Sequence, residues 1–398
     1  MARGCWLLVV LAAAVGAQDF DQLVFSRDGD LWAVPLAGGE ARRITHTPER
    51  ESRPVACPDG MVIAYEVYDD LVRDYAVWLC SADGQTARKV LPMGRTPAWS
   101  PDGGRLLFVL PASGGLDICL ATRAGGNVLR LTETTEPEYF PVWAPDGARV
   151  AFVRDVFEGQ RRSAIVVREP NGREQTVTTV AGGITSLSWA PAERLLYSAR
   201  AGNSGRDELF VVAPDGGKPQ LLSDGLDSES LAVWTGDGQQ FVYIESSNNQ
   251  TRLKTRGPGV RGKLVAGTQS GDGDPSVLPG LARRAPQVFV RGRRSFYLPT
   301  PRLVGEDLLV PVADLAGQLG LTVAVDVDGV TLAQGEKRAK LSLDGKVALG
   351  EVTKEVVPSP LTVAGVMLAP ARAVAEWFGF ASEWRGETRV LRLGEEGK

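Results

Sequence analysis

A tryptophan, a small residue and the tripeptide Pro-Asp-Gly return together along this chain at a nearly constant distance. "WSPDG" begins at Trp99 and "WAPDG" at Trp143, and the weaker copies "WAPAE" and "WTGDG" begin at Trp189 and Trp234. A fifth opening, "ACPDG", starts at Ala56. A period of about 45 residues that contains strands rather than helices limits the fold more than any other feature of the sequence.

Each unit repeats one internal order of short strands and turns. After Trp99 come the turn "PDGG", the apolar run "RLLFVLP", the run "LDICLATR" and, after a second turn, "NVLRLT". Four short strands per repeat make one blade of a β-propeller. The tryptophan before each turn is predicted to pack between adjacent blades, with a stacking platform for a ligand as the alternative.

The Pro-Asp-Gly tripeptide suits a tight turn between two strands. Proline presets φ, aspartate can bind the local backbone, and glycine accepts a positive φ. The residues predicted to be structural turn residues are therefore Pro58, Asp59, Gly60, Pro101, Asp102, Gly103, Pro145, Asp146 and Gly147.

The two ends of the repeat region indicate how the ring closes. Residues 22–45 supply three strands without a leading one, and residues 274–280 supply one strand with none after it. If the late strand completes the first blade, the ring closes at six blades and leaves no sheet edge open. The predicted fold class is therefore an all-β six-bladed propeller followed by a small α+β domain.

The repeat motif resembles a known family. "SPDG" followed by "LLF", "GG" and "LRLT" is similar to the PD40 repeat of TolB-like propellers, and the resemblance covers about residues 20–280. It is not the WD40 pattern, because no Trp-Asp dipeptide occurs. The resemblance implies a binding protein that engages a protein partner in the cell envelope, although propellers host many activities.

A second repeat occupies the C-terminal part of the chain. "LVPVADLAGQLG" (309–320) matches "LAPARAVAEWFG" (368–379), each with proline at the first helical position and glycine past the end. The helix faces predicted to be buried are Val312, Leu315, Ala316 and Leu319, and Ala371, Val374, Ala375 and Phe378. A hairpin follows each helix, the first turning at Asp328-Gly329.

This second repeat resembles the copper amine oxidase N-terminal-like domain, a stalk-type module of exported proteins. Pro370, Arg372, Gly379 and Trp384 fit its pattern, whereas Ala313 and Val325 of the first copy depart from it. Nothing in the sequence resembles the domain of that oxidase that carries copper and a quinone, so no cofactor is expected.

The N-terminus resembles a secretory signal peptide. Arg3 precedes an uncharged stretch from Gly4 to Gln18 that is too short to cross a bilayer, and cleavage is expected after Ala17. An uncleaved anchor or a buried N-terminal strand is the alternative. The expected organisation is a signal peptide at 1–17, the propeller at 18–280, an Arg/Pro-rich linker at 281–302 and the α+β domain at 303–398.

Composition excludes some classes of function. A formal net charge of −4 argues against a general nucleic-acid binder, because binding to phosphates needs an excess of cations clustered on one face. The mature chain keeps Cys57, Cys80 and Cys119. Since they lack C-x-x-C spacing, they are predicted to be buried free thiols, with a Cys57–Cys80 disulfide as the alternative.

Catalytic chemistry has few candidate residues. His46 is the single histidine, which argues against a histidine-held metal and against Ser or Cys hydrolases, and it is predicted to be a loop residue. No metal site is therefore expected. Carboxylates are plentiful, but the clearest aspartates, Asp59, Asp102, Asp146 and Asp237, are all predicted turn residues.

Arginines gather in the expected linker. The six are Arg283, Arg284, Arg291, Arg293, Arg294 and Arg302. A solvated linker face is one interpretation; contact of Arg291, Arg293 and Arg294 with an anionic envelope polymer, a lipid surface or an acidic protein patch is the other.

The sequence therefore predicts an exported protein, periplasmic or secreted, without a transmembrane segment after cleavage. It is expected to be a non-enzymatic, monomeric binding or scaffold protein whose partner is an envelope protein or an anionic envelope polymer. Two alternatives stay open: a carbohydrate-active hydrolase or lyase that uses carboxylates of the propeller funnel, and a purely structural surface protein.

Overall fold

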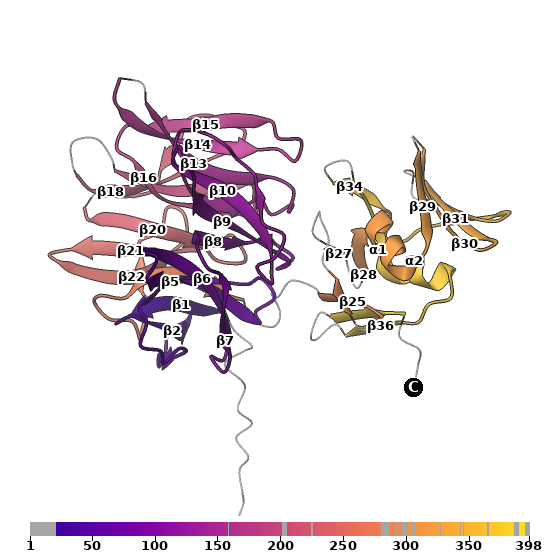
Figure 1. Cartoon of the computed structure of the whole chain (residues 1–398), viewed down its shortest axis with the longest axis horizontal. Coiled ribbons are helices and arrows are strands. Elements are labelled where there is room, and N and C mark those ends of the chain that lie inside the picture. Colours follow the sequence, from indigo (N-terminus) through magenta and orange to yellow (C-terminus); the bar gives the residue numbers. More distant parts are fainter. Residues whose placement is uncertain are drawn as a thin grey trace, which may run out of the picture.

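The described chain consists of a ring of β-sheets and a smaller α+β domain (Figure 1). The computed structural model describes residues 21–157, 159–200, 205–223, 226–279, 287–291, 293–295, 301–304, 307–326, 328–342, 344, 346–363, 366–385 and 390–394. The expected signal peptide at 1–17 lies outside these residues.

In the described residues of the ring, six four-stranded antiparallel sheets can be distinguished, and we call them blades 1 to 6. Blade 1 contains β24 (Gly273–Leu278), β1 (Gln22–Arg27), β2 (Asp30–Pro35) and β3 (Arg42–Arg43). Blade 2 contains β4 (Glu51–Ala56), β5 (Val62–Asp69), β6 (Asp74–Ser81) and β7 (Ala87–Leu91). Blade 3 contains β8 (Arg95–Trp99), β9 (Arg105–Pro111), β10 (Leu116–Thr122) and β11 (Leu129–Arg130).

The remaining blades follow the same order along the chain. Blade 4 contains β12 (Glu138–Trp143), β13 (Val150–Phe157), β14 (Arg161–Arg168) and β15 (Glu174–Val180). Blade 5 contains β16 (Ile184–Ala190), β17 (Arg194–Arg200), β18 (Asp207–Val212) and β19 (Gln220–Leu221). Blade 6 contains β20 (Ser228–Trp234), β21 (Phe241–Ser247), β22 (Gln250–Arg256) and β23 (Lys263–Leu264).

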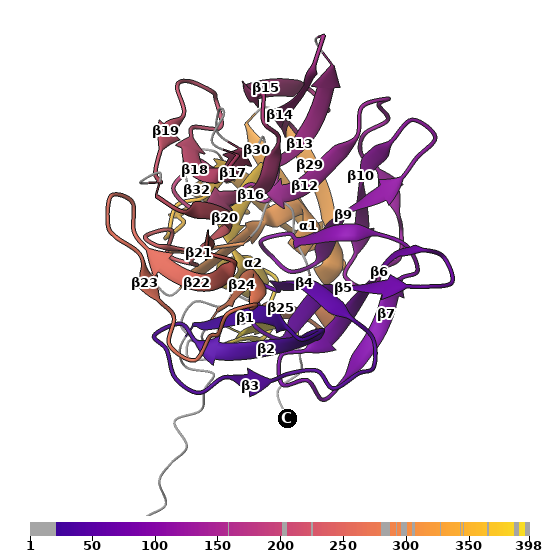
Figure 2. The ribbon, with the colours of Figure 1, turned by 90° about the vertical axis from the view of Figure 1, so that its left-hand side faces the viewer.

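The late strand β24 completes the first blade by pairing antiparallel with β1, so that Leu23 lies opposite Val277. Two side-chain contacts reinforce this junction: Arg27 Nε lies 2.6 Å from Asp272 Oδ1, and Ser26 Oγ donates to Asp274 Oδ2 at 3.0 Å. Figure 2 shows the blades arranged around a central opening. The pairing leaves no open gap between the first and last blades.

The repeated tryptophans pack between neighbouring blades, as the sequence predicts. Trp99 shares an apolar cluster with Cys57 and Leu106, and its indole Nε1 donates to Val55 O of the preceding blade at 3.0 Å. Trp189 and Trp234 occupy equivalent clusters. Arginine guanidinium groups cover three of the rings, at 4.9–5.3 Å from the ring centroids: Arg123 over Trp99, Arg149 over Trp189 and Arg194 over Trp234.

The Pro-Asp-Gly turns have the chemistry that their composition indicates. Asp102 Oδ1 accepts the Gly104 N–H at 2.9 Å, and Asp146 Oδ1 accepts the Ala148 N–H at 2.7 Å. Gly103 has φ +70°, a left-handed conformation that favours glycine. Asp59 does more than shape its turn, because it is fully buried and its Oδ2 accepts a hydrogen bond from Arg123 Nη1 of the next blade at 2.6 Å.

A buried hydroxyl and a buried glutamate join three pairs of consecutive blades. In the junction of blades 5 and 6, Ser223 Oγ accepts the Leu209 N–H at 2.7 Å and donates to Glu229 Oε2 at 2.7 Å. Thr45 with Glu51 and Thr132 with Glu138 repeat this arrangement at the same spacing of six residues. Each connection between these blades is therefore fixed by a polar contact that is shielded from water.

The described residues of the small domain form three sheets and two helices. The first sheet holds β26 (Arg293–Ser295), β25 (Gln287–Val290), β37 (Val390–Leu393) and β36 (Ser382–Arg385). The second holds β27 (Arg302–Val304), β28 (Asp307–Pro311), β35 (Val366–Pro370) and β34 (Leu361–Val363). The third holds β29 (Thr322–Asp326), β30 (Gly329–Gln334), β31 (Lys337–Ser342), β32 (Lys346–Leu349) and β33 (Val352–Glu355). The helices are α1 (Val312–Leu319) and α2 (Ala371–Trp377).

Both helices follow a strand that ends in proline. Pro311 and Pro370 are the N-cap residues of α1 and α2, one position earlier than the first helical residue predicted from the sequence. The helix residues expected to be buried are all buried. Gly320 ends α1 with φ +77°, and Gly379 follows α2 with φ +80°.

Two sequence-based boundaries need correction. Strand β25 pairs in parallel with β37 and antiparallel with β26, so residues 287–290 and 293–295 belong to a sheet of the small domain rather than to a linker over 281–302. The parallel partner lies about 100 residues further along the chain, which a local pattern does not indicate. The hairpin turn predicted at Asp328-Gly329 lies one residue earlier, because Gly329 already pairs with Asp326.

All three described cysteines, Cys57, Cys80 and Cys119, are buried and free, so the alternative Cys57–Cys80 disulfide is absent. Burial raises the pKa of the Cys57 thiol well above its ordinary value. This thiol is therefore protonated at neutral pH and unreactive.

Substitution at Gly103 tests the packing between blades 2 and 3. A Cβ on Gly103 would lie 2.6 Å from Cys57 Sγ, whereas a Cβ on Gly259, which has a similar φ of +75°, would meet no atom within 4 Å. We expect Gly103→Ala to lower the free energy of unfolding by about 1–3 kcal/mol more than Gly259→Ala in urea titrations. Equal losses would show that this interface is looser than described.

Candidate functional site

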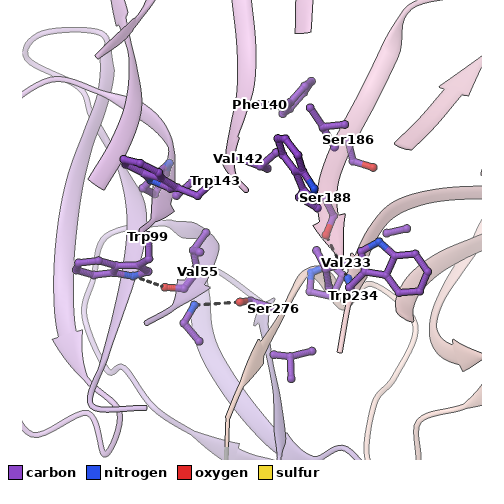
Figure 3. A pocket seen from close by; sticks show the side chains of 18 of the residues that line it. Val55, Trp99, Phe140, Val142, Trp143, Ser186, Ser188, Val233, Trp234 and Ser276 are labelled. Carbon is purple, nitrogen blue, oxygen red and sulfur yellow. Dashed lines mark hydrogen bonds between the residues drawn. The ribbon is translucent and has the colours of Figure 1, made fainter. Parts of the chain in front are cut away.

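A cavity of about 550 Å³ lies on the axis of the ring. The first strand of each blade contributes to its wall, namely β24, β4, β8, β12, β16 and β20. Figure 3 shows Val55, Val142, Val233 and Ser276 around the opening, with the rings of Trp99, Trp143 and Trp234 at its wall. We call this cavity the funnel. Its volume lies in the range of small-ligand sites, about 300–1,000 Å³.

Prolines occur at the same position of four innermost strands and line the funnel: Pro54, Pro97, Pro141 and Pro275. The innermost strand is the edge of its blade, and its open side faces the funnel. Proline is tolerated at such an edge because it has no N–H group that needs a partner. The wall is therefore apolar and stiff where a ligand would touch it.

A ring of left-handed residues lies beside the prolines. Arg53, Thr96, Phe140, Leu231 and Asp274 have φ between +47° and +51°, and all five line the funnel. The strand pairing shifts by a β-bulge at the same point in these blades. Bulges re-aim side chains, and uncommon backbone conformations cluster at functional sites.

Blade 5 supplies a polar section of the wall. Ser198 Oγ lies 2.6 Å from Ser186 Oγ and 2.8 Å from Thr185 Oγ1, and Thr185 and Ser186 line the funnel. Serines also join neighbouring inner strands: Ser188 Oγ accepts the Trp234 N–H at 3.3 Å, and Ser276 Oγ accepts the Ala56 N–H at 3.0 Å. The wall thus offers hydroxyl groups between its apolar side chains, with Thr185 and Ser186 adjacent on blade 5.

Charged groups gather at one end of the funnel. Arg53 Nε lies 3.8 Å from Glu66 Oε2, and the Arg53 guanidinium lies 5.5 Å from the centroid of the Phe140 ring. Asp274 Oδ2 accepts the Arg53 backbone N–H at 3.3 Å. We call Arg53, Glu66, Phe140 and Asp274 the charged end of the funnel.

Glu66 is buried next to the funnel wall and contacts two of the left-handed residues, Arg53 and Thr96. Its Oε1 accepts the Thr96 N–H at 2.5 Å, and only 2% of the residue is exposed. Burial raises the pKa of Glu66 to about 7, while Arg53 and the Thr96 N–H act in the opposite direction. The carboxyl group can therefore gain or lose a proton near neutral pH.

Sequence reasoning did not single out Glu66, although the repeat contains a signal for it. Glu66 lies opposite Ser52 at the bulge of blade 2, and the corresponding positions of blades 3, 4 and 6 hold Val109, Val153 and Ile244. An alignment of the repeats would therefore have shown an acidic residue in blade 2 at a position where blades 3, 4 and 6 have an aliphatic one. That difference is the signal for Glu66.

The structure places the predicted site residues as follows. The turn prolines Pro58, Pro101 and Pro145 line the other end of the funnel, away from the charged end. His46 is exposed in the loop before β4. Arg291 binds within the small domain, donating to Leu319 O at 2.9 Å and covering the Phe380 ring, and the side chains of Arg293 and Arg294 lie outside the described residues.

The small domain lies beside the ring (Figure 1). Thr362 of the small domain lines a shallow second pocket together with Asp146, Arg149 and Glu193 of the ring. The charged end of the funnel is on the face opposite to the Pro-Asp-Gly turns, because Arg53 lies near the start of β4 and such a turn follows the end of that strand.

The described part of the funnel wall carries few charged side chains. Within the described ranges the wall holds one carboxylate, Asp274, and one guanidinium, Arg53. The described residues contain no group of three or more His, Cys, Asp or Glu side chains suited to a metal ion.

Comparison with known proteins agrees with this architecture. Residues 73–282, more than half of the chain, match the family model of the TolB β-propeller domain. The chain belongs to the TolB β-propeller family. Residues 290–393 match the copper amine oxidase N-terminal domain. No curated protein matches the sequence significantly.

Solved structures similar to the TolB-type ring share its fold. TolB from Acinetobacter baumannii is 19% identical with a TM-score of 0.55, and the match covers 66% of this chain and 68% of that one. A putative TolB from Agrobacterium tumefaciens is 16% identical with a TM-score of 0.52, covering 64% and 91%. A chain of a nidogen/laminin complex is 12% identical with a TM-score of 0.54, covering 65% and 99%. Across the part of the chain that the structure describes, neither helix is long and apolar enough to span a membrane.

The raised pKa of Glu66 predicts how stability depends on pH. The pKa of Glu66 is about 7 in the folded protein and 4.5 ordinarily, so the folded state binds this proton more tightly than the unfolded state does. The contribution of this proton to the free energy of unfolding is therefore complete below about pH 4.5 and is lost as the pH rises to about 7. Glu66→Gln lacks this charge. We expect it to exceed the wild type in unfolding free energy at about pH 8 by up to about 3 kcal/mol.

Urea titrations between about pH 5 and pH 8 measure this effect, with Glu133→Gln as an exposed control. A Glu66→Gln profile parallel to that of the wild type would contradict the burial of an ionisable group at this position.

Proposed function

We propose that this protein is an exported, non-enzymatic binding protein of the cell envelope. Its TolB propeller, closed as six blades, receives an extended segment of a partner protein in the funnel. The small domain acts as a stalk that positions the propeller. The single observation that carries this proposal is the apolar, proline-lined funnel of about 550 Å³ on the ring axis.

The construction of the funnel supports binding of an extended chain. Its wall consists of the inner edges of blades that tryptophans and arginines pack firmly together. Because this wall is already ordered, little conformational entropy is lost when a ligand binds. Val142 and Val233 offer apolar contacts, while Thr185 and Ser186 offer hydroxyl groups to backbone amides. An extended peptide presents both kinds of group along its length.

Export and the absence of catalysis belong to the same proposal. The sequence at 1–17 supports export, and the likeness to TolB supports a role in the envelope. The lone carboxylate on the described part of the funnel wall gives the alternative of a paired-acid glycan hydrolase no support.

The proposal is tested by placing a photo-crosslinking residue at Val142 in the funnel and, as the matched control, at Val128 on the outer surface, where the valine is 53% exposed. Crosslinking is carried out in the native envelope. We expect a specific protein to be captured from position 142 and not from position 128.

The captured protein is then purified, and its dissociation constant is measured with two variants. Val142→Phe fills part of the funnel and is expected to weaken binding by about tenfold or more, whereas Val128→Phe leaves it unchanged. Equal binding by both variants would place the partner site elsewhere, and turnover of an envelope glycan by the purified chain would overturn the non-enzymatic role.

A further inference from the structure

Arg53, at the charged end of the funnel, has hydrogen-bond donors that meet no acceptor among the described residues. Its Nε is 3.8 Å from Glu66 Oε2, beyond hydrogen-bonding distance, and its side chain is 39% exposed although it lines the funnel. We propose that Arg53 binds the C-terminal carboxylate of the partner's polypeptide segment. This inference rests on the proposed function of the funnel.

The geometry favours an anionic group over a cationic one. Asp274 Oδ2 already accepts hydrogen bonds from Ser26 Oγ and from the Arg53 N–H. Glu66 is buried and accepts the Thr96 N–H, so a ligand cation does not reach it. Asp274 is thus already engaged by two donors, whereas the side-chain N–H groups of Arg53 donate to no acceptor among the described residues. The guanidinium of Arg53 therefore has the largest open hydrogen-bonding capacity at this end of the funnel.

Phe140 prepares this guanidinium for a carboxylate. The ring lies 5.5 Å from the guanidinium carbon and comes from blade 4, whereas Arg53 comes from blade 2. A guanidinium held against an aromatic face keeps its planar set of N–H donors available at its edge. Carboxylates match that set with two parallel hydrogen bonds.

Glu66 competes with the ligand for Arg53. An ionised Glu66 attracts the guanidinium, and a protonated Glu66 releases it. The other charged groups that face Glu66 are Asp274 and Arg95, and Arg95 is paired with Asp74 at 2.6 Å. Because burial raises the pKa of Glu66 to about 7, a carboxylate ligand should bind more tightly below about pH 7 than above it.

The test uses short acetylated peptides of Ala, Pro, Val, Leu and Phe, made once with a free C-terminal carboxylate and once with a C-terminal amide. Both sets are passed over the immobilised full chain at about pH 6 and about pH 8, and retention is measured by mass spectrometry. We expect the acid set to be retained about tenfold more than the amide set at the lower pH, with a smaller preference at the higher pH.

Variants assign the effect to the two side chains. Arg53→Gln is expected to remove the preference for acids. Arg53→Lys keeps the positive charge but lacks the planar set of donors, so we expect it to reduce the preference. Glu66→Gln should give the same preference at both pH values. Arg88→Gln, at an exposed arginine of β7, is the control that leaves every value unchanged.

The outcomes separate this inference from the proposed function. Equal retention of acids and amides, both blocked by Val142→Phe, would overturn the carboxylate inference and keep the funnel as the binding site. Retention that Val142→Phe does not affect, or no retention of either set, would overturn both. Binding of octanoate with the same pH dependence, but of neither peptide set, would assign the carboxylate to a fatty acid and reject a polypeptide partner.

Discussion

The pairing of β24 with β1 is the contact on which the rest of the ring depends. It joins segments about 250 residues apart, and the Arg27–Asp272 ion pair, whose aspartate is fully buried, lies beside it. The same junction creates the charged end of the funnel, because it brings Asp274 to the backbone of Arg53. Without closure, the funnel would not form and Asp274 would not lie on its wall beside Arg53.

Two kinds of surface in each blade have separate roles. The broad faces carry the tryptophans and the buried apolar residues that hold neighbouring blades together, as in the cluster around Trp99 and Leu106. The inner edge carries proline, a β-bulge and a left-handed residue, as at Thr96 and Pro97. The broad faces therefore fix the ring, and the inner edges are free to differ from blade to blade.

The sequence predicts the parts of this structure that repeat. Turn chemistry and the strand pattern indicate the blades, the tryptophans between them and the two helices, because each depends on residues close together along the chain. The late strand at 274–280 could be assigned to the first blade only by counting strands at both ends. The parallel pairing of β25 with β37 has no local signal, which explains the overlong linker.

The candidate site was harder to predict, since its chemistry comes from exceptions to the repeat. Pro54 and Pro97 are visible in the sequence, but their position on an edge facing the funnel follows only from the assembled ring. Arg53 comes from blade 2 and Phe140 from blade 4, and their contact depends on how the assembled ring places these two blades. Glu66 departs from the aliphatic pattern of Val109 and Val153, and its raised pKa depends on burial that the sequence alone does not specify.

Native-state hydrogen exchange of the full chain tests the closure most directly. If β24 completes blade 1, those β24 amides that pair with β1, and the amides of β1, should exchange only in the same cooperative opening as a central strand such as β13. Rapid exchange of these paired β24 amides while β13 stays protected would show an open ring, and an account built on a closed funnel would then be wrong.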